Sequence, residues 1–504
     1  MGAICCRYLT KITIFVVMLR EMFENLKSKL AKMPMVMVVL PFAVGIFVAD
    51  GVELSAWLLF LGSVVALVGV AWLKEGWRNF AIVTSLAMVG ALLHTISCHE
   101  RVEYNRAVDM VLEVDRSSVD REGYTSAEAT IEECEEHSFE RCKVVIWGDS
   151  LVHFAAGDRL HLTTPIRPFR AERERYARLM QHRGFVGSIS VNHRATYEYI
   201  PAERPSLHDG AVARLRSAME PSDERAVVLA MTTGERSELP TTLRQCYSAS
   251  GASHLLAVSG LHIGIAFMLI NLLLLPLVLL RYGNVVRSVV AVALVWCYVW
   301  LCGLSPSAVR AAIMFSMLQL ALSSEREYMS LNILAGTAFA MLAFDSHMLF
   351  DISFQLSFIA VMGIVLWGAP LYMACATRWK AVNMLLGVLL VGVASTLATM
   401  PLVSHTFSTV SLVGVLINPV VLILANVILL AGVISLALPF MSVVAEWAAW
   451  LQNGVVEWAS GVPCGHFDVE MPSWAMWTIY ALYVVVTILL LLLPKPKKAP
   501  KIEG

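Results

Sequence analysis

Long apolar segments alternate with short polar loops over most of the chain, and one polar region interrupts them. Three apolar segments open the chain, at about 34–49, 55–73 and 79–97. After the polar region they continue near 254–280, 285–302, 306–322, 329–345, 352–373, 382–402, 411–438, 440–461 and 474–494. A transmembrane helix needs roughly 20 mostly apolar residues. The pattern therefore predicts a polytopic α-helical membrane protein of about 11–12 spans with one inserted water-exposed domain.

Composition supports lipid exposure of these segments. Of the 504 residues, 58% are hydrophobic and 15% are charged, and the mean hydropathy is +0.68. Soluble globular domains are roughly 45–50% apolar and about 25% charged. The apolar excess therefore has to face lipid. The formal net charge of −1 argues neither for nor against a polyanionic partner.

The polar region divides into two parts. Residues 99–205 hold five short runs that alternate or are rich in β-branched residues, at 108–114, 125–131, 142–147, 159–164 and 187–199. Five short strands suit a small β-barrel of the oligonucleotide/oligosaccharide-binding (OB) type, with a general sandwich as the alternative. Residues 206–250 favour amphipathic linker helices along the outer membrane surface, with Arg214, Arg216 and Arg225 on the wet side.

One strongly basic stretch, RPFRAERERYARLMQHRGF, lies before the last of these runs. As a helix it would be basic along much of its surface, although Glu172 and Glu174 dilute the charge. Most such stretches are solvated faces, and the alternative is a surface that collects nucleic-acid phosphates. Its arginines are Arg167, Arg170, Arg173, Arg175, Arg178 and Arg183.

Basic residues set the expected orientation. Cytoplasmic loops carry an excess of Lys and Arg, and the segment before the first apolar run is rich in both. We therefore expect residues 1–98 to hold a cytoplasmic N-terminal segment and three spans, which places the β domain outside the cytoplasm. Alternate later loops are marked as cytoplasmic by Arg281, Arg287, Arg326, Arg378 and Lys380, and the basic tail 496–504 is expected inside as well.

Segment 440–461 leaves the number of spans open. It carries Glu446, Gln452, Asn453 and Glu457, so it either crosses the membrane or lies flat at the interface as an amphipathic helix. At the other end of the chain we expect no cleavable signal peptide. The apolar run 12–19 is short, and no small-residue cleavage site follows it.

The ten cysteines show no metal-ligand spacing, with no CxxC pair, and the chain has no HxH cluster. We therefore expect neither a metal site nor a cofactor. Cys134 and Cys142 both lie in the polar domain and flank a short charged stretch. They could form a disulfide across a hairpin if that domain faces an oxidising compartment.

The second helical block opens with SASGASHLLAVSGLHIGI, which puts polar residues inside an apolar segment. In a continuous helix His254 and His262, eight residues apart, would share a face, with Ser259 close to it. Gly260 and Gly264 form a GxxxG pair that lets a second backbone approach. Ionisable residues in a membrane segment usually face a bundle interior or a water-filled cavity. The alternative is a tightly packed helix whose histidines bond to neighbours.

Two further polar clusters enter apolar segments from the outer side. In LCGLSPSAVRAAIM, Ser305 and Pro306 make a favourable helix start, and Arg310 follows roughly 6 Å along the axis. In FDISFQLSF, Asp351 and Gln355 enter the membrane at the same level. Arg310 either forms a structural pair with Asp351 or lines an aqueous path and meets phosphates.

Together the three segments resemble the ComEC family, the inner-membrane channel for single-stranded DNA in natural transformation. HLLAVSGLHIG at 254–264 is close to the most recognisable signature of that family, and SPSAVRAAIM and FDISFQLSF fall where its later motifs would. The order of N-terminal helices, extracytoplasmic domain and helical block matches as well. The resemblance covers nearly the whole chain and assigns residues 251–495 to the channel domain.

The resemblance implies a multi-pass protein of the bacterial inner (plasma) membrane that passes single-stranded DNA into the cytoplasm. DNA-path residues would be His254, Ser259, His262, Arg310, Asp351 and Gln355, and aromatic residues of the β domain could stack bases. Other expected partners are membrane lipid, a separate DNA receptor, a nuclease and a cytoplasmic motor or single-strand-binding proteins. A homo-oligomer is compatible with these residues.

The sequence departs from the family pattern in one respect. Many members end in a metallo-β-lactamase-like nuclease domain, whereas no HxHxDH sequence occurs here, and there is no GxxxxGK loop for ATP. We therefore do not expect an enzyme. Strand degradation and driving force would come from other proteins.

Two functions from other classes stay open on the residues. An intramembrane serine hydrolase would pair Ser253 or Ser259 with His262 or His405. A small-solute transporter would require inverted repeats, and the sequence shows none.

Overall fold

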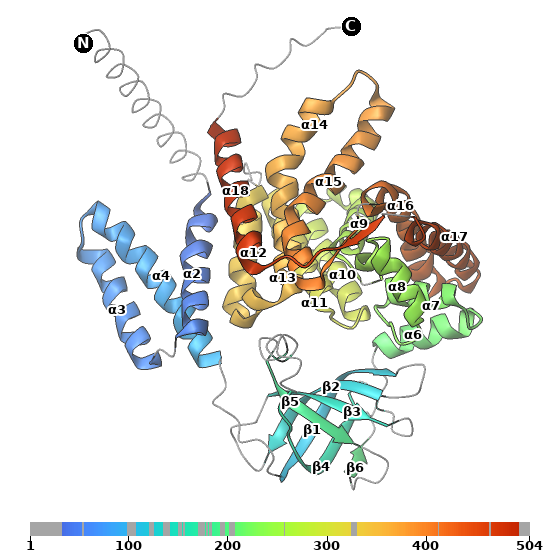
Figure 1. Cartoon of the computed structure of the whole chain (residues 1–504), viewed down its shortest axis with the longest axis horizontal. Helices are drawn as coiled ribbons and strands as arrows, with labels where there is room; N and C mark the ends of the chain where they lie inside the picture. The colour runs from blue at the N-terminus through green and yellow to red at the C-terminus, as the bar shows by residue number, and fades with distance from the viewer. Residues whose placement is uncertain are drawn as a thin grey trace.

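The structure is a computed structural model in which a helical body carries a separate β domain (Figure 1). It describes residues 33–52, 55–97, 107–119, 125–134, 142–149, 154, 157–169, 177, 180, 184–191, 197–200, 207–256, 258–323, 330–411, 413–462 and 465–492. The five further arginines of the basic stretch, Arg170 to Arg183, and the basic tail 496–504 lie outside these residues.

Three helices form the N-terminal group: α2 (Pro34–Gly51), α3 (Ala56–Trp72) and α4 (Glu75–Ser97). They coincide with the first three apolar segments of the sequence. Glycines let α2 and α4 approach closely, because a Cβ on Gly45 would collide with the carbonyl of Ala87, and one on Gly90 with that of Phe42. The helix α2 also packs against α12 of the second block.

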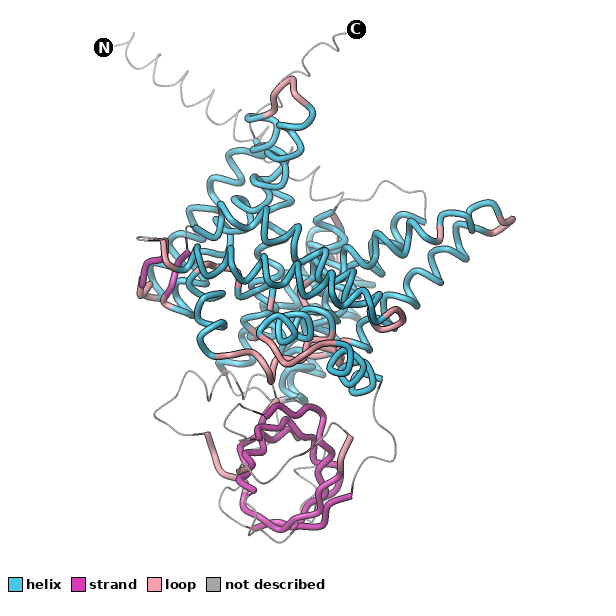
Figure 2. Tube along the Cα trace, turned by 90° about the vertical axis from the view of Figure 1, so that its right-hand side faces the viewer, coloured by secondary structure: helices cyan, strands magenta, loops and turns pink. Residues whose placement is uncertain are grey.

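The β domain is one curled sheet built on alternating residues (Figure 2). Its strands are β1 (Ala107–Val119), β2 (Thr125–Cys134), β3 (Lys143–Gly148), β4 (Arg159–Pro165), β5 (Phe185–Val191) and β6 (Tyr197–Ile200). They follow the order β5-β3-β2-β1-β4-β6, and all pairs are antiparallel except β3–β5. One face of β1 and β2, including Leu112 and Ile131, is buried in the domain core.

This sheet differs from the expectation in one detail. The last expected run, 187–199, is two strands, β5 and β6, which lie at opposite edges of the sheet. The OB-type barrel stays a prediction, because no ladder joins β5 to β6 in the described residues.

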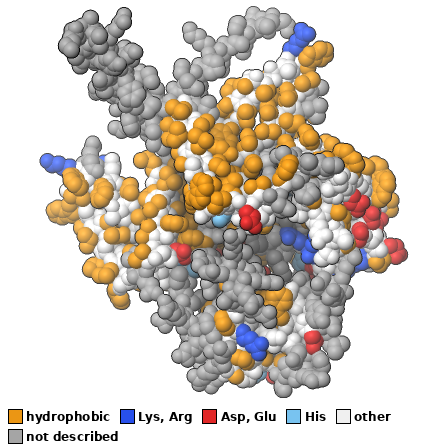
Figure 3. Space-filling view, viewed as in Figure 1, with side chains coloured by type: hydrophobic (Ala, Val, Ile, Leu, Met, Phe, Trp, Pro, Cys, Tyr) orange, Lys and Arg blue, Asp and Glu red, His pale blue; other side chains and the backbone are white. Residues whose placement is uncertain are grey.

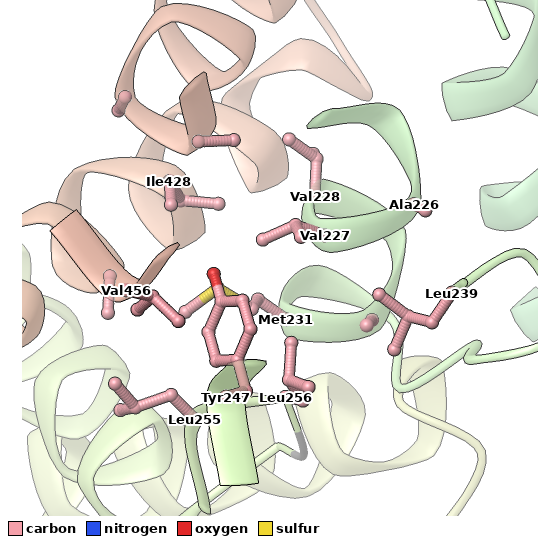
Figure 4. Close-up of a cluster of buried hydrophobic side chains, with 14 of the residues drawn as sticks. Ala226, Val227, Val228, Met231, Leu239, Tyr247, Leu255, Leu256, Ile428 and Val456 are labelled. Carbon is pink, nitrogen blue, oxygen red and sulfur yellow. The ribbon is translucent and has the colours of Figure 1, made fainter. Parts of the chain in front are cut away.

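Three short helices connect the β domain to the second block: α6 (Leu207–Ala218), α7 (Asp223–Thr232) and α8 (Thr241–Ala249). The expectation of surface helices does not hold for α7, because residues 226–232 are all buried. This helix packs against α16, α17 and α6. Figure 4 shows Val227, Val228 and Met231 of α7 in one cluster with Ile428 of α16 and Val456 of α17. Its apolar run is too short to span a membrane, yet its continuous burial places it in the protein core.

The second block holds the remaining elements. Its first half contains η3 (Ser253–Leu255), α9 (Gly260–Leu273), η4 (Leu275–Leu279), α10 (Gly283–Leu301), α11 (Pro306–Ser323), α12 (Ser330–Phe344) and η5 (Ser346–Phe350). Its second half contains α13 (Ile352–Gly363), a π-helical turn (Ile364–Gly368), α14 (Ala369–Cys375), α15 (Lys380–Phe407), α16 (Val413–Ser435), η7 (Pro439–Met441), α17 (Ser442–Ser460) and α18 (Ser473–Leu492). A short ladder of β7 (Thr409–Ser411) and β8 (His466–Asp468) joins the end of α15 to the start of α18.

Five helices in the described chain are long and apolar enough to cross a membrane: Pro34–Gly51, Trp77–Ser97, Gly283–Leu301, Val382–Phe407 and Val413–Ser435. The described chain also has six shorter apolar helices. The helix α17 belongs neither to the five long helices nor to the six shorter ones. The expected count of about 11–12 spans is thus supported only in its coarse form, a mostly helical protein with membrane-length helices. Several apolar segments are shortened by breaks, such as the 3₁₀ turn that follows α9 and the π turn before Pro370. Hydrophobic side chains cover much of the described helical surface (Figure 3).

Candidate functional site

The expected helix through His254 and His262 is interrupted. Gly251, with φ +78, turns the chain from α8 into the single 3₁₀ turn η3, and α9 begins only at Gly260. Ser259 is the N-cap of α9, and its backbone N–H donates to Nδ1 of His262 over 3.2 Å. The two histidines therefore do not share one helix face, because serine followed by glycine favours a helix start over a helix interior.

The two histidines also differ in exposure. His262 is fully buried, whereas the side chain of His254 is exposed. His262 therefore helps to hold the start of α9 and does not line an open wall as the sequence suggested. Of the pair, only His254 keeps solvent-exposed surface, and it does so in densely packed surroundings.

The GxxxG pair lies against α11. A Cβ on Gly260 would lie 3.7 Å from Cβ of Ala311, and one on Gly264 would lie 2.8 Å from Cζ of Phe315. The ring of Phe315 in turn stacks on Phe267 with centroids 5.0 Å apart. Because Gly264 has no side chain, the ring of Phe315 on α11 can pack against α9. The motif therefore serves the packing of α9 against α11, the helix that also carries Arg310.

Arg310 is a buried cation on the first half of α11, with 4% of its surface exposed. Its Nη2 donates to Oγ of Ser353 on α13 over 2.6 Å. The charge of Asp351 acts on the guanidinium, but among the described residues no direct ion pair within 4.0 Å joins the two. Instead Oδ1 of Asp351 accepts the backbone N–H of Phe354 over 2.9 Å and caps α13.

The buried guanidinium is only partly satisfied. Within the described residues its Nε has no hydrogen-bond partner. The structural Arg310–Asp351 pair that the sequence allows is not present as a direct contact, although the charge of Asp351 still favours the charged guanidinium. Such a cation retains capacity to bind a further acceptor.

Gln355 has a structural contact in this arrangement. Its Nε2 donates to the carbonyl of Leu349 over 2.9 Å, which ties α13 back to the 3₁₀ helix η5. Arg310, Asp351, Ser353 and Gln355 are therefore brought together around the start of α13. His254, Ser259 and His262 belong to the neighbouring α9 region, which contacts α11.

A second polar cluster, which the sequence analysis missed, joins the N-terminal helices to η5. Nδ1 of fully buried His94 lies 3.0 Å from Oγ of Ser346, and its Nε2 lies 3.5 Å from Oδ1 of Asp50. The ring of His347 is 5.0 Å from that of His94. The signal in the sequence was a histidine near the end of an apolar segment. Ser346 is itself only 2% exposed. The Ser346–His94–Asp50 contacts therefore fit a structural role that joins helices better than nucleophilic attack on a substrate.

The serine–histidine pairs of the hydrolase alternative have other contacts. Nδ1 of His262 accepts a backbone N–H, as described above. Nδ1 of His405 donates to the carbonyl of Met471 over 2.8 Å. Each imidazole thus has one nitrogen committed to the backbone, and Ser253 is exposed in η3 on a separate element.

The outward face of the sheet is rich in carboxylates. Nε2 of His161 lies 3.1 Å from Oδ2 of Asp109, and hydrogen bonding to that carboxylate raises the pKa of His161. Glu113 shares a hydrogen bond with Glu132, which raises the pKa of Glu113. Arg159 pairs with Glu132 over 3.1 Å. This face would repel DNA phosphates.

The other residues singled out in the β domain and linker have local partners. Cys134 and Cys142 are buried neighbours, and burial, with a smaller effect from Cys134, raises the pKa of Cys142 to about 11. Their cross-linking stays a prediction. Arg216 and Arg225 both pair with Glu238, over 2.7 and 2.9 Å.

Comparisons with known proteins converge on one family. The family model described as Competence protein matches residues 231–496, more than half of the chain and a range that holds α9, α11 and α13. The chain is 30% identical over 235 residues to an uncharacterized protein of Aquifex aeolicus (46% of this chain, 53% of the relative). It is 26% identical over 220 residues to ComE operon protein 3 of Bacillus subtilis (44% and 27%), and 26% identical over 166 residues to the uncharacterized protein YcaI of Escherichia coli (32% and 22%).

The matched parts span about half or less of these relatives' own length. No solved structure matches the chain. The family match rests on the second helical block, where the three sequence motifs and the buried cation of α11 lie. The chain belongs to the Competence protein family.

Proposed function

We propose that this protein forms an inner-membrane channel through which single-stranded DNA enters the cytoplasm during natural transformation. Membership of the Competence protein family and similarity to ComE operon protein 3 support a role in DNA uptake. The membrane-length apolar helices are compatible with a multi-pass membrane protein. The β domain would lie outside the cytoplasm, as the distribution of basic residues predicts.

The observation that carries this proposal is Arg310. A phosphodiester cannot pass bare hydrocarbon without cationic or hydrogen-bonding contacts, because an isolated charge there is prohibitively costly. Arg310 offers a permanent charge, one side bonded to Ser353 and Nε without a partner in the described residues. A guanidinium of this kind matches the geometry of a phosphate. In the proposal Arg310 makes a transient contact with the DNA backbone.

The test is a transformation assay on Arg310→Ala, with protein levels checked in the membrane fraction. A hydrogen bond to a charged group contributes about 1.5–3 kcal/mol, so loss of the contact should lower uptake of labelled DNA into the cytoplasm by about tenfold or more. Arg310→Lys, which keeps the charge but not the planar fork, should fall in between.

Arg378→Ala is the matched control. Arg378 is an arginine in the loop between α14 and α15 that lies 5.8 Å from the ring centroid of Trp379. Its removal should leave uptake unchanged. Undiminished uptake in Arg310→Ala at normal protein level would count against the proposal.

In this proposal the protein is a conduit with no catalytic role. A DNA receptor, a nuclease and a motor or single-strand-binding protein on the cytoplasmic side are separate partners. The hydrolase alternative has a direct test, which is labelling of the purified protein with a fluorophosphonate probe. Labelling that Ser259→Ala or Ser253→Ala removes would favour that alternative.

A further inference from the structure

The two faces of α17 have an unusual division of side chains. The face toward α16, α7 and α8 is buried and carries small residues and two amides, at Ala445, Ala448, Ala449, Gln452, Asn453, Val456 and Ala459. Tyr247 bonds both amides inside: it donates to Oδ1 of Asn453 and accepts from Nε2 of Gln452, both over 2.9 Å, while Oε1 of Gln452 has no partner in the described residues. The outward face carries Val443, Val444, Trp447, Trp450, Leu451 and Trp458. A helix that faces water has the opposite arrangement.

The three outward tryptophans are 61%, 60% and 68% exposed, which is a large apolar area to leave in water. Tryptophan is enriched at membrane–water interfaces, because its ring is apolar and its N–H is polar. The partner that fits this face is therefore the headgroup region of a lipid bilayer. The spread of the tryptophans along the axis then indicates how the helix lies.

Trp447 and Trp458 are about 17 Å apart along α17, with Trp450 between them. The hydrocarbon core of a bilayer is about 30 Å thick. If α17 crossed the bilayer, tryptophans so close together could not occupy both interfaces. The exposed positions between Leu451 and Trp458 are Gly454 and Glu457, so this face has no aliphatic middle section either.

Two other helices carry the continuous exposed aliphatic face that α17 lacks. In α3, Trp57 and Trp72 lie at opposite ends, about 22 Å apart, with exposed leucines and valines between them. In α18, Trp474 and Trp477 lie in the first turns, and exposed aliphatic residues from Leu482 to Leu489 follow. The helix α17 differs from both, although all three have large exposed apolar side chains.

The packing of α17 extends the argument to α16. These two helices form a hairpin joined by η7 and are in contact along their length. The ladder of β7 and β8 holds both ends of the hairpin together, since Ser411 pairs with His466 and Thr409 with Asp468. In Figure 1, α16, α17, α7 and α6 follow one another toward the β domain. The chain thus leaves and returns at one level.

We propose that the α16–α17 hairpin does not cross the bilayer but lies along its outer boundary, with the tryptophan face of α17 in the lipid headgroups. The exposed aliphatic stripe of α16, which includes Leu416, Val420 and Ile423, would face the acyl chains. The length and composition of α16 alone would allow a crossing, but its partner holds it at the interface. The inference rests on the proposed function only in placing the protein in a bilayer.

Accessibility of the hairpin turn tests this inference. Leu438 is 47% exposed in the turn before η7. In a variant without the native cysteines, Leu438→Cys should react with a membrane-impermeant maleimide added outside, or from neither side. Reaction from the cytoplasmic side alone would place the turn across the bilayer and overturn the inference. Arg378→Cys and Glu198→Cys define the two sides as controls.

These controls also separate the two proposals. If both controls react from the same side of a sealed membrane, or if the chain is found outside the membrane fraction, the proposed channel function fails. If the controls report opposite sides but Leu438→Cys reacts from the cytoplasm alone, only the position of the hairpin is wrong.

Quenching of tryptophan fluorescence gives an independent readout. In vesicles that contain lipids brominated near the headgroup, replacing Trp447, Trp450 and Trp458 by Phe should remove part of the quenching. Lipids brominated near the chain ends should quench the variant and the unchanged protein alike. The matched control replaces Trp474 and Trp477 of α18 by Phe. Equal quenching losses with both lipids, or disulfide-linked pairs of Trp447→Cys chains without headgroup quenching, would contradict the inference.

Discussion

Arg310 in the helical block and Arg159 in the β domain carry the same guanidinium in opposite surroundings. Arg159 has 53% of its side chain exposed and pairs with Glu132 over 3.1 Å. Arg310 is 4% exposed and has a serine hydroxyl, not a carboxylate, as its hydrogen-bonded partner. Exposed pairs contribute about 0–1 kcal/mol, whereas a buried charge without a full set of partners costs stability.

The difference in hydrogen bonding between the two arginines indicates that the helical block, and not the β domain, is the place to look for a ligand-binding site. The exposed carboxylates and arginines of the sheet have partners among themselves, as in the Asp109–His161 and Arg159–Glu132 pairs. The cation of α11 retains an unmet hydrogen-bonding need that folding alone does not explain. A ligand that supplies negative oxygen atoms would meet that need.

The comparison predicts unequal costs when the side-chain interaction of each arginine is removed. Ser353→Ala removes the hydrogen bond that the structure gives the buried Arg310 and should lower the free energy of unfolding by about 1.5–3 kcal/mol. Arg159→Gln removes an exposed pair and should cost less than about 1 kcal/mol. Unfolding of the purified protein in detergent, followed by tryptophan fluorescence, measures both. Equal costs would break the distinction between the two sites.

A smaller effect is expected from pH at the sheet. Hydrogen bonding to Asp109 raises the pKa of His161 above its ordinary 6.5, so this pair stabilises the fold below that value and ceases to do so as the pH rises through the folded pKa of His161. The bond from His161 lowers the pKa of Asp109 below 3.8, so that carboxylate contributes above 3.8 and is lost in acid.

Hydrogen exchange of the amides of β1 and β4 in the full chain measures this effect, with His161→Gln compared with the unchanged protein at each pH. Raising the pH from about 6 to about 8 should reduce protection in the unchanged protein relative to the variant. A constant difference between the two proteins over this range would show that the pair does not titrate there.

Much of the architecture could be predicted because apolar runs and alternating strands are local signals. The three N-terminal helices and most strands coincide with their runs for this reason. The break between His254 and Gly260 could not be predicted from hydropathy, since HLLAVSGLHIGI is mostly apolar and the turn depends on Ser259 as an N-cap. The burial of α7 could not be predicted for a related reason. A helix of 10 residues is too short to span a membrane, and only its packing against neighbouring helices shows that it belongs to the protein core.

The site was predicted unevenly. The sequence pattern places Arg310, Asp351 and Gln355 at one level of their helices, and the structure brings them together. Ser353, which accepts the hydrogen bond of Arg310, could not be predicted as a site residue, because single serines are common in apolar segments. The contact of His94 with Ser346 joins residues 252 positions apart, and no local pattern reports a contact of that range.

A cross-link between DNA and α11 tests the central claim most directly. A photoreactive side chain at Ser307, three residues before Arg310 and on the same side of the helix, would be illuminated in cells during uptake of labelled DNA. The same side chain at Arg159 is the comparison. The account predicts cross-links of single-stranded DNA to residue 307 and none to residue 159. Cross-links at 159 with none at 307 would contradict it.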